Sequence, residues 1–214
     1  MSVSVKKTGI VSSSGIIGTN LVVGTQSSTY EGGGSGSRSR GKLGVGSGGN
    51  GTFQIVEDYT VPIGKYSYNI LNNTSGNRDY QCDQIPYISG QTYTGSWWAK
   101  GSGTCLYRSW DITTSSQPMS KTFTLTADWQ YYTHTFTATS AMETDNCTFH
   151  LGVTGTSSIY ICGMKLEEGT IATPWCPAPE DEYSVGSTIG FNEIDSTKAS
   201  IAKEYINATD FIEI

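Results

Sequence analysis

The stretch KTFTLTADWQYYTHTFTAT (121–139) alternates threonine with aromatic and aliphatic residues over most of its length. Successive side chains of a β-strand point to opposite faces, so this alternation collects the apolar residues on one face. Threonine and the aromatic residues are also the types that fit a pleated, half-buried surface. The stretch therefore predicts β-structure that buries one face against a core.

Segments of the same character recur on both sides of this stretch: TYTGSWWAK (92–100), CTFHLGVTG (147–155) and SIYICGMKLEEG (158–169). Clusters of small and polar residues separate them, for example KGSG (100–103) and TGTSS (154–158), and these clusters indicate turns. Short strands at regular turn spacing are typical of an all-β, antiparallel β-sandwich. The three prolines of TPWCPAPEDE (173–182) cannot continue a strand ladder, so the sandwich is expected to end there.

Composition and charge exclude several classes of protein. The 214 residues suit one domain with extensions, and 7 Leu against 28 Thr and 27 Ser disfavour a helical bundle. The chain has no run of about 18 apolar residues that could span a membrane, and its start, MSVSVKKTG, lacks the apolar core of a secretory signal. The net charge of −6 lies in residues 180–214, because residues 1–179 hold 11 basic and 11 acidic side chains. Without a basic stripe we expect no nucleic acid partner, and without a span no membrane insertion.

The chain divides on these criteria into an N-terminal flanking segment (1–18), the sandwich (19–182) and an acidic C-terminal segment (183–214). Within the sandwich, ten glycines in residues 32–51 predict a long surface loop. The flanking segments carry short apolar runs that cannot form a core alone, so we expect them to pair between chains and to assemble a homotrimer. Residues 198–206 fit either a strand or a helix.

The five cysteines are widely spaced and odd in number: Cys82, Cys105, Cys147, Cys162 and Cys176. A structural zinc site needs close ligand pairs, and a disulfide framework usually has an even count. We therefore expect buried free thiols and no metal site.

The acidic and histidine residues do not form a recognisable catalytic group. Glu167 and Glu168 are adjacent acids at the end of an expected strand, for which solvated charge is a better account than a general acid and base. His134 alternates with Tyr132 and Phe136, which predicts a partly buried structural histidine. The sequence thus predicts a protein that is not an enzyme.

Aromatic residues supply the candidate binding site. Alternation in TYTGSWWAK (92–100) places Trp97 in the core and Trp98 on the solvent-facing side. An indole or phenol ring covers the apolar C–H face of a sugar, while polar neighbours take up its hydroxyl groups. The candidate carbohydrate-binding residues on these grounds are Trp98, Tyr107, Arg108 and Trp110. Two further tryptophans, Trp129 and Trp175, are expected in the core together with Trp97.

Four segments, in order, resemble the carbohydrate-binding jelly-roll modules of bacteriophage tail, baseplate and head-fibre proteins: NLVVGT (20–25), SGQTYTGSWWAKGSG (89–103), DWQYYTHTFT (128–137) and IYICGMKLEEGTIATPWCPAPEDE (159–182). The closing pattern, KLEEG followed by AT-PW-PAPED, is the most specific of them. The resemblance implies a two-sheet jelly roll of about eight strands. Relatives often hold a structural Ca²⁺ through acidic groups, but the last strand here lacks the aspartate common in them, so no cofactor is expected.

The resemblance implies a virion structural protein, a fibre or fibre-like appendage that is assembled in the host cytoplasm. Its expected partners are bacterial surface glycans, which it would bind during host adsorption, and other virion proteins. A single shallow sugar site binds weakly, and several copies on one particle raise the avidity. Two alternatives stay open: a purely structural decoration, plug or spike protein without a ligand and, less favoured, a glycan hydrolase.

Overall fold

The computed structural model describes residues 11–12, 15–16, 18–25, 27–29, 43–45, 51–82, 84–143 and 147–181. The chain divides at Asp181 into two units, and every described residue belongs to the first. Most of the flanking segments to which the sequence assigns oligomerisation, and the open choice at 198–206, therefore lie outside the described residues.

The described residues form strands and almost no helix, so the predicted all-β class is confirmed. The strands are β1 (Val11–Ser12), β2 (Gly15–Ile16), β3 (Gly44–Val45), β4 (Gly51–Glu57), β5 (Tyr66–Asn72), β6 (Asn77–Cys82), β7 (Thr92–Asp111), β8 (Ser116–Thr124), β9 (Gln130–Thr137) and β10 (Cys147–Glu168). All pairings are antiparallel. β1 pairs only with β2 among the described strands, and the other eight form one continuous sheet.

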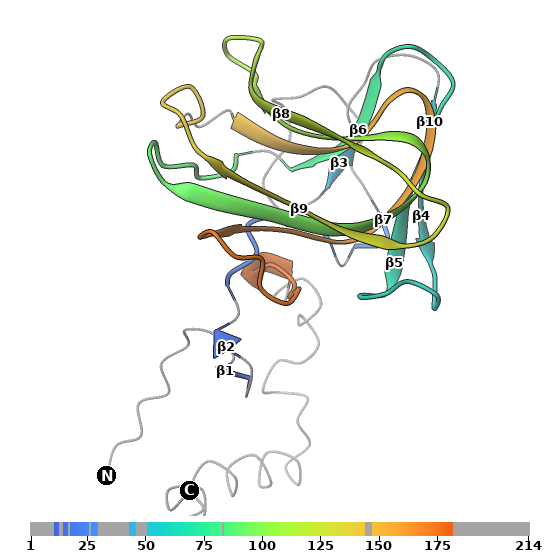
Figure 1. Cartoon of the computed structure of the whole chain (residues 1–214), viewed down its shortest axis with the longest axis horizontal. Helices are drawn as coiled ribbons and strands as arrows, with labels where there is room; N and C mark the ends of the chain where they lie inside the picture. The colour runs from blue at the N-terminus through green and yellow to red at the C-terminus, as the bar shows by residue number, and fades with distance from the viewer. Residues whose placement is uncertain are drawn as a thin grey trace, which may run out of the picture. The chain divides into compact units, whose positions relative to one another are not determined.

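That sheet folds into two layers, and the long strands β7 and β10 each run through both of them. The first half of β7 pairs with β9 and the second half with β8. The first half of β10 pairs with β6 and its later part with β5, while β7 runs along its other side. One layer therefore has the order β3-β6-β10-β7-β8 and the other the order β4-β5-β10-β7-β9, and we name this second one the β4–β9 layer (Figure 1).

The passage from one layer to the other occurs at two segments that the sequence predicts as turns. KGSG (100–103) and TGTSS (154–158) lie inside β7 and β10, and the register between the two strands shifts there. Gly101 has a φ of 147°, and a Cβ on it would lie 2.0 Å from the carbonyl oxygen of Ser158. The glycines thus bend a continuous strand, and the turn prediction at both segments is wrong.

The described residues of the Gly-rich stretch 32–51 do not follow the predicted surface loop. Its residues Gly44–Val45 are β3 and pair with β6, and Gly51 opens β4. The preceding Leu43 is fully buried. The rest of the stretch lies outside the described residues.

The core lies between the two halves of β7. Trp97, fully buried, stacks on Tyr107 with 5.1 Å between the ring centroids and also contacts Tyr132 and Phe123. The Tyr107 ring approaches so closely that a Cβ on Gly95 would lie 2.6 Å from its hydroxyl oxygen. Glycine at position 95 therefore makes room for the tyrosine that comes from the opposite layer.

The closing pattern KLEEG and AT-PW-PAPED has a structural role in this fold. Lys165 is fully buried, and its Nζ lies 3.2 Å from Glu167 Oε2 and donates to Thr173 Oγ1 at 2.6 Å. The backbone N–H of Thr173 donates to the other oxygen of Glu167 at 2.8 Å. A buried charge is tolerated only when it is paired and hydrogen-bonded. The pattern therefore fixes the segment that follows β10 against that strand.

The N-terminal segment of the sandwich is held by the same region. The Asn20 side chain donates to the carbonyl groups of Met164 and Cys176, both at 3.0 Å. Asp181 accepts the backbone N–H of Gly24 at 2.6 Å. Residues 18–25 and 164–181, far apart in the sequence, thus lie side by side and close the sandwich.

The predicted burial is confirmed for four of the five cysteines: Cys105, Cys147 and Cys162 are buried free thiols, and Cys82 is buried. Cys176 is a free thiol that is only half-buried. Burial raises the pKa of both Cys147 and Cys162 to about 12, and it also raises that of Cys105.

Because the thiolate is the reactive form, we expect one fast-reacting thiol in the native protein at about pH 8. Labelling with a thiol reagent should modify Cys176 quickly, and the Cys176→Ser variant should have no quickly labelled thiol. Fast labelling of a thiol other than Cys176 would contradict the burial described here.

Candidate site on the outer face of the β4–β9 layer

A row of side chains crosses four strands on the outer face of the β4–β9 layer. Gln54 of β4 pairs with Asn69 of β5, Asn69 with Tyr160 of β10, and Tyr160 with Lys100 of β7. Directly paired residues of an antiparallel sheet share a face. The neighbouring Ile159 and Ile161 of β10 are fully buried in the core, so Tyr160 and its row face outward.

A shallow cavity of about 300 Å³ lies along this row. It is lined by Thr52, Gln54, Asn69, Ile70, Leu71, Ser158 and Tyr160. Tyr160 is 39% exposed and Leu71 44%, so apolar surface is open to a ligand on this face. The lining contains no charged side chain. We name this cavity the Tyr160 groove.

The polar groups of the Tyr160 groove suit hydroxyl-bearing ligands. Asn69 Oδ1 accepts a hydrogen bond from Ser67 at 2.5 Å, which leaves its Nδ2 group to donate elsewhere. Gln54 is exposed and supplies a second amide. An amide both donates and accepts, and hydroxyl groups such as those of Thr52 and Ser158 do the same. A ring flanked by such groups can hold a sugar by its apolar face and by its hydroxyl groups.

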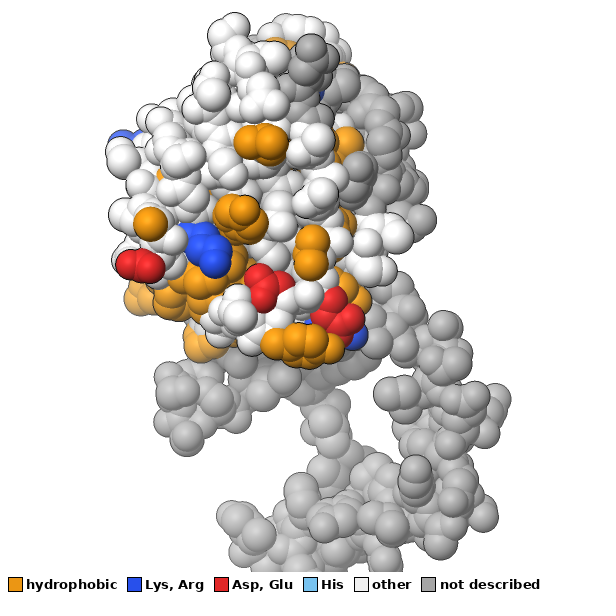
Figure 2. Space-filling view, turned by 90° about the vertical axis from the view of Figure 1, so that its right-hand side faces the viewer, with side chains coloured by type: hydrophobic (Ala, Val, Ile, Leu, Met, Phe, Trp, Pro, Cys, Tyr) orange, Lys and Arg blue, Asp and Glu red, His pale blue; other side chains and the backbone are white. Residues whose placement is uncertain are grey.

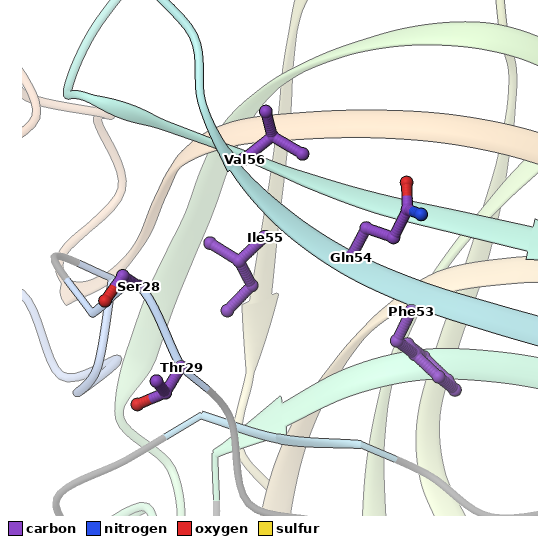
Figure 3. Close-up of a pocket in the computed structure, with 6 residues that line it drawn as sticks. All are labelled: Ser28, Thr29, Phe53, Gln54, Ile55 and Val56. Carbon is purple, nitrogen blue, oxygen red and sulfur yellow. The ribbon is translucent and has the colours of Figure 1, made fainter.

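A second cavity, of about 490 Å³, lies beside β4 and is lined by Ser28, Thr29, Phe53, Gln54, Ile55 and Val56. Figure 3 shows Phe53 and Ile55 on the side of β4 that faces Ser28 and Thr29, and Gln54 and Val56 on the other side. Gln54 is the one residue that lines both cavities.

Lys100 lies at the other side of Tyr160. Its Nζ is 5.4 Å from the centroid of the Tyr160 ring and 4.9 Å from that of the Trp129 ring. Trp129 is half-buried at this surface and is absent from the core cluster, so its predicted core position is wrong. Tyr131 pairs with Trp98 and therefore shares its outward face. Trp129 lies two residues before Tyr131, so alternation places it on the same face. Figure 2 shows a basic side chain against hydrophobic ones on the side of the molecule that carries β4 and β5.

Trp98 lies on the predicted, outward face of β7. Its ring centroid is 5.3 Å from that of Tyr131, which is 45% exposed. The side chain is itself half-buried, since it also packs near Gly163. Trp175 is half-buried too and donates its indole N–H to the Met164 carbonyl group, so it covers the end of the sandwich and is absent from the core cluster where the sequence places it.

The other three candidate residues do not join Trp98. Tyr107 is fully buried against Trp97, so its predicted role as a sugar contact is wrong. Arg108 and Trp110 lie on the outer face of the opposite layer, where the guanidinium carbon is 5.3 Å from the Trp110 ring centroid. Alternation already separates Tyr107 from Arg108, and the bend at Gly101 separates both from Trp98.

Arg108 is committed to a buried ionic cluster and not to a ligand. Its NH2 group lies 2.8 Å from Asp79 Oδ2, and His150 Nδ1 lies 2.8 Å from Asp79 Oδ1. His150 Nε2 is 2.5 Å from the hydroxyl oxygen of Thr148, which itself donates to the carbonyl of Trp110. Asp79, His150 and Thr148 are at most 2% exposed, so this arrangement of Thr, His and Asp has no access to a substrate. It is a structural network.

The remaining chemical predictions concern acids, histidine and metal. Glu167 is buried in an ion pair, so the prediction of solvated charge is wrong for this residue. Glu168 is exposed, and the two do not form an acid and base pair. His134 is half-buried among aromatic rings, as predicted. Within the described residues, no group of three or more His, Cys, Asp or Glu side chains could hold a metal ion. The described chain also contains no helix of the length and hydrophobicity needed to cross a membrane.

The sequence contains a signal for the Tyr160 groove that our prediction missed. In SIYIC (158–162), Tyr160 alternates with two isoleucines, which places it opposite the core in the same way that places Trp98. Asn69 and Gln54 have no such signal, because their proximity to Tyr160 depends on which strands pair with β10.

Comparison with known proteins supports the fold. No family model and no curated protein sequence matches the chain. Among solved structures, a Bacteroides thetaiotaomicron protein assigned to sugar binding has a TM-score of 0.51 at 10% identity, over 71% of this chain and 100% of that one. The CBM22-1 xylan-binding domain from Paenibacillus barcinonensis gives 0.48 at 10% identity, over 73% and 98%. A structure described as CBM4 gives 0.42 at 22% identity, over 55% and 78%.

Some matched structures are longer chains, of which this protein spans 19% to 23%. At identities below a quarter, likeness of structure shows the fold and not the ligand. The chain accordingly has an antiparallel β-sandwich, a fold that it shares with the Bacteroides thetaiotaomicron protein.

Proposed function

We propose that this protein is a non-enzymatic glycan-binding component of a bacteriophage particle, and that the Tyr160 groove holds the sugar. The observation that carries the proposal is the exposed Tyr160 ring between the amide of Asn69 and the ammonium group of Lys100, next to an uncharged cavity. The sandwich fold supports it, since known sugar-binding modules share that fold. The phage role rests on the sequence resemblance across residues 19–182.

The same proposal includes assembly. A shallow groove of about 300 Å³ is at the small end of ligand sites, so one copy would bind weakly. Several copies on one particle, as a homotrimeric fibre attached to other virion proteins, would raise the avidity by orders of magnitude. The assignment to a virion and the attachment to other virion proteins rest on the resemblance, and the flanking segments would form the contacts between chains.

A glycan array tests the proposal. The labelled full chain is applied to bacterial surface polysaccharides, and bound signal is challenged with the free glycan. We expect binding that free glycan displaces and no release of reducing ends from the bound polysaccharide. A chain that binds none of them would favour a decoration or spike protein, and reducing-end release would indicate a hydrolase; both results contradict the proposal.

Substitution at Tyr160 tests the assignment of the groove. We expect Tyr160→Ala to weaken glycan binding by about 1–3 kcal/mol, by analogy with ring stacking on bases, and to change the melting temperature little because the ring is partly exposed. Tyr59→Ala is the matched control, because Tyr59 is 88% exposed and lies outside both cavities. Isothermal titration of both variants measures the difference. Equal binding by the two variants would place the sugar elsewhere.

A further inference from the structure

Lys100 is a cation without an acidic partner beside the Tyr160 groove. No described Asp or Glu lies within ion-pair distance of its Nζ. Glu57 of the neighbouring hairpin pairs with Lys65 at 3.0 Å. The pKa of Asp58 is lowered by two hydrogen bonds from Thr60, at 2.7 and 2.8 Å, and also by the charge of Lys100. Lys100 therefore lies near the carboxylate of Asp58 but forms no ion pair with it.

Two rings fix the position of that charge. Lys100 Nζ lies over Trp129 at 4.9 Å and over Tyr160 at 5.4 Å from the ring centroids. A half-buried lysine held by two aromatic faces loses less freedom on binding a ligand than an extended surface lysine would. The ammonium group is thus preorganised at the margin of the groove.

The pairing order across the sheet places this charge within reach of a ligand in the groove. Tyr160 of β10 has Lys100 of β7 on one side and Asn69 of β5 on the other. A ligand that packs on the side of Tyr160 facing Asn69 therefore has the ammonium group just across the ring. The lining of the groove itself is uncharged, so nothing in it repels an anionic substituent.

We infer that the glycan carries an anionic substituent, a carboxylate or a phosphate, that pairs with Lys100. This inference rests on the proposed function of the same groove. The amides and hydroxyl groups recognise the sugar ring, and Lys100 discriminates between acidic and neutral glycans. An ion pair with a partly exposed lysine changes affinity modestly, so the expected preference for the acidic form is about twofold to fivefold.

Calorimetric titration of the full chain with matched glycan pairs tests the inference. One pair is an oligosaccharide containing uronic acid and the same oligosaccharide with its carboxyl groups reduced to alcohols. The other pair is a phosphorylated oligosaccharide and its dephosphorylated form. We expect the acidic member of at least one pair to bind more tightly, by a margin that shrinks as salt rises from about 0.05 to 0.5 M. The pair that shows the preference identifies the anion.

Variants assign the preference to Lys100. We expect Lys100→Gln to bind the acidic and the neutral member of the pair equally, whereas Lys100→Arg should retain the preference for the acidic member. Lys121→Gln is the control, since Lys121 is exposed on β8 in the other layer. Equal binding of acidic and neutral members by the wild type, or a preference that survives in Lys100→Gln, would overturn the inference and leave the proposed function standing. Binding of no glycan would overturn both.

Discussion

Trp97→Ala is expected to lower the free energy of unfolding by about 3–5 kcal/mol, the range for a large aromatic side chain removed from a core. Trp97 is fully buried, stacks on Tyr107 and Tyr132, and meets Phe123 edge-on at 5.2 Å. Its loss opens a cavity between the two halves of β7, where several rigid rings cannot all move to fill the space. Denaturant titration followed by circular dichroism measures the change.

Its neighbour in the sequence is the matched control. Trp98 has the same side chain on the same strand but lies on the outer face and is half-buried. We expect Trp98→Ala to lower the free energy of unfolding by about 1–2 kcal/mol, which is within the range of ordinary substitutions. Equal losses in the two variants would show that the faces of β7 are assigned wrongly.

Asp79→Ala is expected to lower the free energy of unfolding by a similar amount, about 3–5 kcal/mol. Removal of the carboxylate leaves the buried charge of its partners without compensation. Asp79 is 1% exposed, and both of its oxygens are used, one by Arg108 and one by His150. Asp128→Ala is the control, since Asp128 is exposed and we expect its removal to stay within about 0.5 kcal/mol. A small effect at Asp79 would mean that solvent reaches the cluster.

The same ionic cluster predicts that the stability of the protein depends on pH in the acidic range. Burial by itself would raise the pKa of Asp79, but His150 and Arg108 lower it by more, and the net pKa lies below the ordinary value of 3.8. A carboxyl group with a lowered folded pKa adds stability that is complete above its unfolded pKa and is lost as the pH falls through the folded one. The stability difference between wild type and Asp79→Ala should therefore shrink from about pH 5 to about pH 2. A difference that stays constant would exclude an ionised Asp79.

The sequence was sufficient for the fold class and for the faces of individual strands. Two-residue alternation placed Trp97 inside and Trp98 outside, because each assignment depends only on the neighbouring residues. It could not show that KGSG and TGTSS lie within strands. A glycine with positive φ produces either a turn or a bend, and only the pairing of β7 with β10 on both sides of it decides between the two.

The same limit explains the candidate site. Tyr107, Arg108 and Trp110 are close in sequence, and this closeness suggested one site with Trp98. In the structure, one faces the core and two face the opposite layer. The Tyr160 groove instead combines β4, β5 and β10, and its lining residues Thr52 and Tyr160 are 108 residues apart in the sequence. Its composition therefore depends on long-range pairing that no local pattern encodes.

A crystal structure of the full chain with a bound glycan tests the central claim most directly. We predict that a sugar ring lies against Tyr160, with its hydroxyl groups in contact with the amide groups of Asn69 and Gln54. A sugar bound instead on the opposite layer beside Trp110 would contradict the assignment of the Tyr160 groove.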